Sequence, residues 1–143
     1  HINASDVKRV YDLFNGHTFY IQKTFNESFA DTREGEVCTL DTIRTAINNI
    51  IASNDTIFRE ILSNIPEKQK ELLYAIAKDG KAEQITSAEF IKRHRLTSAS
   101  SVQSATKKLL EKDIITERNK VYSLNDKLFA MWINKLYGNT TML

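Results

Sequence analysis

The residues between Ser98 and Lys112 combine hydroxyl, amide and ammonium side chains at helical spacing. Such groups can donate hydrogen bonds to phosphate oxygens, and a glutamine amide can pair with adenine in the major groove of DNA. Contact with DNA is therefore one chemistry that this stretch can perform. The candidate contact residues, together with two cations that follow, are Ser100, Ser101, Gln103, Ser104, Lys107, Lys108, Arg118 and Lys120.

The spacing of these residues predicts a helix with two different faces. Ser98 is placed to cap it, because a serine hydroxyl can accept a hydrogen bond from a free N–H of the first turn. The expected buried face consists of residues that recur at helical spacing, namely Val102, Ala105, Thr106 and Leu109. The hydroxyl, amide and lysine side chains are then expected on the exposed face.

A tight hairpin is predicted directly after this helix. The segment IITERNKVYSL contains two short β-rich runs that are joined by Arg118, Asn119 and Lys120. Asn119 tolerates the positive φ that a tight two-strand turn requires. A last helix, rich in apolar residues, is expected to begin at about Asn125 or Asp126.

The elements before the serine-rich helix complete a recognisable order. Pro66 favours the first turn of a helix that Gly80 can end. Residues 84–85 predict a very short strand, and Thr86 with Glu89 forms a capping box ahead of a further helix. Helix, short strand, helix, helix and hairpin are the order of a winged helix-turn-helix, whose third helix can enter the major groove.

The first half of the chain predicts four helices. Ser5 can cap the first and Gly16 can end it. The later three are expected over 18–30, from Thr39, and from Asn54 or Asp55. Apolar stripes predict the buried faces of the first two helices, namely Val7, Val10, Tyr11 and Phe14 on one and Ile21, Phe25 and Phe29 on the other.

These patterns together predict a mainly α protein with three parts. A small helical bundle is expected over 1–64, a winged helix-turn-helix domain with a hairpin wing over 65–136, and a tail over 137–143. Residues 1–66 carry a net charge of −3 and residues 67–143 a net charge of +5. The second part is therefore the one suited to a polyanion.

Composition excludes several other classes of protein. No apolar run approaches the roughly 20 residues of a membrane span, so no membrane partner is expected. The single cysteine, Cys38, rules out an internal disulfide framework and favours the reducing cytoplasm. The three histidines are scattered and none has the spacing of a zinc site, so we expect no bound metal. No catalytic residues are predicted.

Four segments of the sequence resemble a known family. They are VYDLFNGHTFYIQ, KQKELLYAIAKDG, the helix-to-strand junction SASSVQSATKKLLEKDII and LFAMW. The chain is similar to the C-terminal portion of prokaryotic AAA+/STAND-type ATPases, often called archaeal-type ATPases. The similarity extends from Ser5 to about Ile133. It implies a longer parent protein with an N-terminal P-loop domain that binds ATP and Mg²⁺, followed by a helical lid and a winged helix.

The resemblance also implies particular roles for residues of the first half. Residues 5–62 would form the lid, and Gly16, His17 and Thr18 match a Gly-x-Pro turn that lies near the nucleotide in members of the family, with threonine in place of proline. The chain itself has no Gly-x-x-x-x-Gly-Lys-Ser/Thr segment. We therefore expect no ATP hydrolysis by this chain, and its first partner would be the P-loop domain of its parent.

Two other functions fit the same residues. Many winged helices pack against a protein partner and never touch DNA, and the serine-rich helix carries no arginine while Glu111 offsets part of its charge. The chain would then be an interaction module that regulates the ATPase or another protein. A third possibility is a stand-alone transcription regulator whose N-terminal helices form a dimer.

Overall fold

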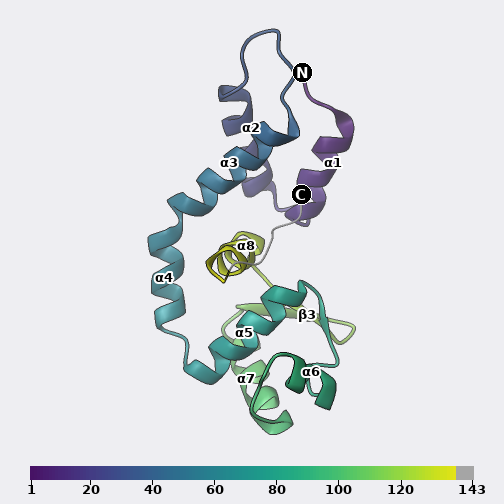
Figure 1. The fold of residues 1–143 in the computed structure, drawn as a ribbon, viewed down its shortest axis with the longest axis vertical. Helices are drawn as coiled ribbons and strands as arrows, with labels where there is room; N and C mark the ends of the chain where they lie inside the picture. The colour runs from purple at the N-terminus through teal and green to yellow at the C-terminus, as the bar shows by residue number, and fades with distance from the viewer. Residues whose placement is uncertain (138–143) are drawn as a thin grey trace. The chain divides into compact units, whose positions relative to one another are not determined.

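The computed structural model describes residues 1–137, which form two compact units joined near Asp55 (Figure 1). Helices dominate both units, which confirms the predicted mainly helical class. The helices of the first unit are α1 (Ala4–Leu13), α2 (Thr18–Ala30) and α3 (Leu40–Ser53). The second unit, which begins at Thr56, contains α4 (Asp55–Ser63), α5 (Glu67–Asp79), β1 (Ala82–Glu83), α6 (Ala88–Arg93), α7 (Ala99–Glu111), β2 (Ile115–Arg118), β3 (Val121–Leu124) and α8 (Lys127–Leu136).

In the first unit, helix α2 buries hydroxyl side chains where aromatic ones were predicted. Thr24 and Ser28 are fully buried, and each donates its hydroxyl hydrogen to the carbonyl oxygen four residues earlier, both at 2.7 Å. Phe29 is 47 % exposed, so its assignment to the core was wrong. Small side chains that satisfy their own polar atoms allow α2 to pack closely on α3.

The predicted stripe of α1 is only half correct. Val10 and Phe14 are buried, whereas Val7 and Tyr11 are exposed. A ten-residue helix that packs on one neighbouring helix needs only a narrow apolar stripe, and residues four apart are enough to supply it.

Two helix caps differ from the prediction by one or two residues. Asn3 caps α1 by accepting from the N–H of Ser5 at 3.1 Å, and Ser87 caps α6 by accepting from the N–H of Phe90 at 3.1 Å. Ser5 and Thr86 were the predicted caps. Only a residue with extended backbone just outside the first turn can accept such a bond, and neighbouring polar residues compete for that position.

The short strand also lies two residues earlier than predicted. Strand β1 pairs Ala82 with Tyr122 and Glu83 with Val121. Gln84 has a φ of 50°, a left-handed conformation that ends the extended backbone, so residues 84–85 cannot continue the strand.

Helix α4 groups with the second unit, whereas the sequence pattern placed the boundary after residue 64. The ring of Phe58 lies 5.1 Å from that of Phe129 and 5.7 Å from that of Trp132. These contacts attach α4 to α8. Pro66, which directly precedes α5, therefore lies inside the second unit and not at its boundary. Of the predicted tail 137–143, only Tyr137 lies within the described residues, where it caps α8.

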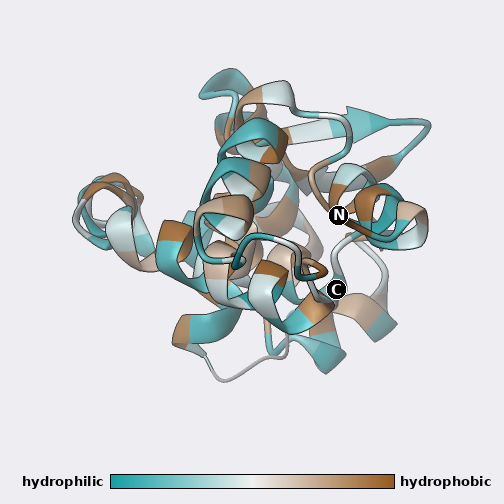
Figure 2. Ribbon diagram, turned by 90° about the horizontal axis from the view of Figure 1, so that it is seen from above, coloured by the Kyte–Doolittle hydropathy of each residue, from teal (hydrophilic) through white to brown (hydrophobic). Residues whose placement is uncertain are grey.

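The second unit is built on α5, which packs against α7, α8 and strand β3. The sheet is antiparallel with the order β1-β3-β2. Figure 2 shows apolar and polar bands alternating along the helices, as expected where each helix buries one face. No helix among residues 1–137 is long and apolar enough to cross a membrane.

Cys38 lies in the first unit and is fully buried. Its backbone N–H donates to the carbonyl oxygen of His1 at 2.7 Å, and it forms an isolated parallel bridge with Ile2. The thiol is therefore shielded from solvent.

Candidate nucleic-acid interface

Helix α7 has the two faces that its sequence predicts. Ser98 caps it, with its hydroxyl oxygen accepting from the N–H of Ser101 at 3.1 Å. The inward residues are all buried, namely Val102, Ala105, Thr106 and Leu109. Burial of this face therefore determines which residues of α7 lie on the outward face.

The predicted contact residues of α7 are exposed with one exception. Ser101 is half-buried because it lies in the capped first turn. Lys108 lies 3.5 Å from Glu111, a surface ion pair that holds the side chain only weakly. The exposed residues are Ser100, Gln103, Ser104, Lys107 and Lys108.

The hairpin after α7 forms a wing with a two-residue turn. Asn119 and Lys120 have φ values of 53° and 61°, as in the type I′ turn that suits twisted strands. A side-chain oxygen of Glu117 accepts from the N–H of Lys120 at 2.9 Å and closes the turn. Arg118 and Lys120 are exposed at the tip.

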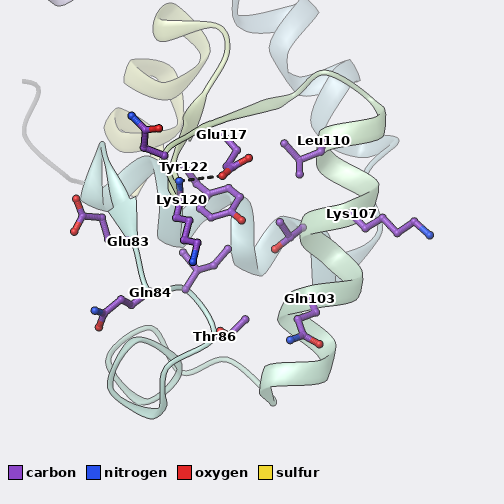
Figure 3. Close-up of a pocket in the computed structure, with 12 residues that line it drawn as sticks. Glu83, Gln84, Thr86, Gln103, Lys107, Leu110, Glu117, Lys120 and Tyr122 are labelled. Carbon is purple, nitrogen blue, oxygen red and sulfur yellow. Dashed lines mark hydrogen bonds between the residues drawn. The ribbon is translucent and has the colours of Figure 1, made fainter.

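A groove of about 750 Å³ lies between α7, the wing and the connection from β1 to α6. Figure 3 shows the Lys120 side chain running into the space between wing and α7, whereas Lys107 points away from the wing. The cations therefore lie on both sides of the groove. The residues that line it are Glu83, Gln84, Ile85, Thr86, Gln103, Thr106, Lys107, Leu110, Glu117, Asn119, Lys120 and Tyr122.

Sequence reasoning missed two carboxylates and an aromatic ring in this groove. Tyr122 pairs with Ala82 on one side and Glu117 on the other, so β3 brings the two edge strands together. Glu83 and Glu117 thereby come to line the same groove. Alternation along the hairpin could have identified Glu117, but nothing in the sequence shows that Glu83 pairs beside the wing.

The turn between α6 and α7 is closed by backbone hydrogen bonds. The N–H of Leu96 donates to the carbonyl oxygen of Ile91 at 2.8 Å, and that of Arg95 to the carbonyl oxygen of Lys92 at 3.2 Å. This is a Schellman motif, in which the residue after the cap adopts a left-handed conformation. Arg95 occupies that position, with a φ of 55°.

Two lysines tie the ends of α7 to α5. Lys68 donates to the hydroxyl of Thr97 at 2.7 Å, just before α7 begins, and Lys112 donates to Gln69 at 2.8 Å, just after it ends. Lys68, Thr97 and Lys112 are exposed, and Gln69 is half-buried. The bonds help to set the orientation of α7 on the unit.

Comparison with known families matches this same part of the chain. Residues 56–135 match the family described as "Probable winged helix domain", which begins where the second unit begins. The chain belongs to this winged helix family. No curated protein and no solved structure matches it. In the winged helix domain, α5, α6 and α7 are the three helices and β2–β3 is the wing.

Outside the winged helix domain, Gly16, His17 and Thr18 form the turn from α1 to α2. Gly16 has a φ of 75°, a left-handed conformation in which a residue with a Cβ is strained. His17 precedes the first turn of α2 without a side-chain capping bond, and its ring stacks on Tyr20 at 4.8 Å. The turn is closed by a hydrogen bond from the N–H of His17 to the carbonyl oxygen of Phe14 at 3.0 Å, and it contains no lysine or arginine.

No group of three or more His, Cys, Asp or Glu side chains within residues 1–137 is arranged to hold a metal ion. The exposed residues of α7 and the wing include hydroxyls, an amide and cations, together with the carboxylates of Glu111 and Glu117. The hydroxyl, amide and cationic groups can donate hydrogen bonds to an anionic or polar surface.

Proposed function

We propose that the winged helix domain binds double-stranded DNA through α7 and the wing. The observation that carries the proposal is the outward face of α7, which places Gln103, Ser104 and Lys107 in solvent beside a two-stranded wing with Lys120 at its tip. From Thr56 onward the chain has 15 Lys and Arg residues against 10 Asp and Glu residues. This excess favours association with a polyanion.

The side chains divide into those that position the domain and the one that can read a base. Lys107, Lys108, Arg118 and Lys120 supply charge to phosphates, and the small serines permit close approach of α7 to the groove edge. Gln103 can pair through its amide with adenine. We therefore expect strong salt dependence with modest sequence preference.

Titration of the whole chain with a labelled duplex at several salt concentrations tests the proposal. Four cations in contact with phosphates predict a slope of log K against log salt of roughly −3 to −4. The double variant Lys107→Glu with Lys120→Glu should abolish most binding. The matched control, Lys8→Glu with Arg33→Glu in the first unit, makes the same change in net charge and should retain it. Equal losses in both variants would reject α7 and the wing as the contact surface.

A protein partner is the second candidate, and the groove itself favours it. The carboxylates of Glu83 and Glu117 line the groove and would repel a phosphate that entered it. Apolar parts of the lining come from Ile85, Leu110 and Tyr122. A basic, partly apolar peptide fits this chemistry. The variant Glu83→Gln with Glu117→Gln separates the two functions. If the domain binds DNA, this variant should raise the affinity for a duplex. If the groove binds a protein partner, neither form should bind a duplex, and the variant should have a lower affinity for a basic peptide.

We also propose that the chain is the C-terminal part of a cytoplasmic P-loop ATPase, with the first unit as its lid. The support is the resemblance of the sequence, and the lone cysteine fits a reducing compartment. ATP and Mg²⁺ would bind the P-loop domain of the parent, and this part of the protein would regulate that domain without catalysing hydrolysis. The coding sequence upstream of His1 tests this, because a Gly-x-x-x-x-Gly-Lys-Ser/Thr segment should occur within roughly 200 residues, about one domain.

A stand-alone regulator makes a different prediction for the oligomeric state. Such a protein would dimerise through its N-terminal helices, so light scattering would give twice the mass of 16.4 kDa. A monomer that binds a single DNA half-site would favour the role as part of a larger chain.

A further inference from the structure

A second pocket lies within the winged helix domain, among the C-terminal parts of α5, α6 and α8. Its volume is about 380 Å³, which falls in the range of small-molecule sites. None of its lining residues belongs to the groove beside α7. The pocket is lined by Tyr74, Ala75, Lys78, Arg93, His94, Arg95, Ile133 and Tyr137.

Positive charge exceeds negative charge around this pocket. Lys78, Arg93 and Arg95 line it, and the carboxylate of Asp79 lies 2.7 Å from Arg93. Arg93 is held in place by this ion pair and by the ring of Phe90, 5.6 Å away. The free carbonyl groups at the C-terminal ends of the helices carry partial negative charge and balance part of this positive charge. The Asp79 carboxylate and these carbonyl groups together do not balance three cations.

A buried polar atom at the pocket lacks a hydrogen-bond partner. The side chain of His94 is only 6 % exposed, and its Nε2 makes no hydrogen bond. Nε2 lies 3.2 Å from an oxygen of Asp79, close enough for attraction but without hydrogen-bond geometry. The imidazole is thus held next to the Asp79 carboxylate, and the His94 ring lines the pocket together with the three cations.

Arg95 adds a third feature. Its backbone is left-handed at the position of the Schellman motif where glycine is the least strained residue. Arginine at this position is less stable than glycine would be, and its side chain extends the basic lining of the pocket. The backbone conformation alone would favour glycine at this position, whereas the sequence has a cationic arginine that lines the pocket.

We propose that this pocket binds a small phosphate-bearing anion, either inorganic phosphate or a phosphate monoester. A phosphate offers several acceptor oxygens to Arg93, Arg95 and Lys78, and the ring of His94 lies in the wall of the same pocket. The site is separate from the DNA-binding surface proposed above, and it does not depend on that function.

Titration of the whole chain with inorganic phosphate at constant ionic strength, with chloride as the comparison anion, tests the site. The ¹⁵N signals of the His94 ring should shift and saturate with phosphate but not with chloride. A parallel titration with adenosine monophosphate distinguishes a monoester from the free ion, because the tighter of the two identifies the source. Assignment is simple, because the only other histidines are His1 and His17.

The variant Arg95→Gly separates binding from structure. It removes one charge-assisted contact, so phosphate affinity should fall roughly tenfold, while thermal stability should not fall because glycine suits the left-handed position. The control Lys92→Gln removes one charge from the same helix outside the pocket and should change affinity less than twofold. His94 signals that do not move, equal effects of the two variants, or loss of stability in Arg95→Gly would overturn the proposal.

Discussion

Arg95 and Lys120 both hold a positive charge at a backbone conformation that glycine adopts more readily. Their φ values are 55° and 61°, and side chains other than glycine carry a steric penalty there. The sequence indicated a positive φ at Asn119, because asparagine is typical of such turns. It gave no such indication for Arg95 or Lys120, because long cationic side chains are as common on helices and strands as in turns.

Replacing Lys120 by glycine should therefore have opposite effects on stability and on binding. Asn-Gly is the preferred pair for this turn, so the free energy of unfolding should rise by about 0.5–1 kcal/mol. Affinity for duplex DNA should fall because a phosphate contact is lost. Denaturation by urea and a duplex titration measure the two quantities. A variant that is both less stable and unchanged in binding would contradict both assignments.

Tyr74 should lower the stability of the winged helix domain at alkaline pH. Burial, together with a hydrogen bond to Tyr137, raises the pKa of Tyr74 well above its ordinary value of about 10. Above pH 10 the unfolded chain loses this proton while the folded chain retains it, so the free energy of unfolding should fall as pH rises. In Tyr74→Phe that part of the fall should be absent. Unfolding curves between pH 8 and pH 11 test this.

At the scale of elements, periodicity predicted α7 well because its capping serine and its apolar stripe agree. Helix α2 was predicted at the correct bounds, but Phe29 of its expected buried face is exposed, and the fully buried residues are Thr24 and Ser28. Thr24 and Ser28 are buried because each satisfies its own hydroxyl within the helix, and hydropathy alone gives no signal for this. Strand β1 was displaced because its limits depend on pairing with β3, a contact between residues about 40 positions apart.

The cap of α7 offers a direct test of how this element is positioned. Ser98→Ala removes the acceptor for the N–H of Ser101 and should lower the free energy of unfolding by about 0.5–2 kcal/mol. Ser104→Ala makes the same chemical change at an exposed mid-helix position and should be neutral or slightly stabilising. Chemical denaturation of the two variants gives the comparison. Equal effects would mean that the Ser98 hydroxyl does not cap the helix.

At the scale of the whole molecule, the division of charge follows the division of the fold. Residues 1–55 have 5 Lys and Arg against 8 Asp and Glu, and the second unit carries the excess of cations. Charge counts along the chain were enough to predict that two parts differ. They could not place the boundary, because the attachment of α4 depends on the packing of Phe58, which is distant in sequence from Phe129 and Trp132.

Phe58→Ala should show that α4 is part of the winged helix domain. Loss of a buried phenylalanine typically lowers the free energy of unfolding by about 3–5 kcal/mol. Trp132 is the single tryptophan of the chain, so its fluorescence reports the environment of α8 directly. We expect a lower thermal midpoint and a red-shifted emission, whereas Ile57→Ala on the exposed side of α4 should change neither. An unchanged thermal midpoint in Phe58→Ala would mean that α4 is not part of the packed winged helix domain.

The shielding of Cys38 has a practical consequence. The only native thiol cannot be reached by maleimide reagents while the protein is folded, so a cysteine introduced at Glu111 would be the single site of dye attachment. One fluorophore at the exposed C-terminal end of α7 would then report the arrival of a duplex or a peptide, and none of the proposed contact residues would have to be altered.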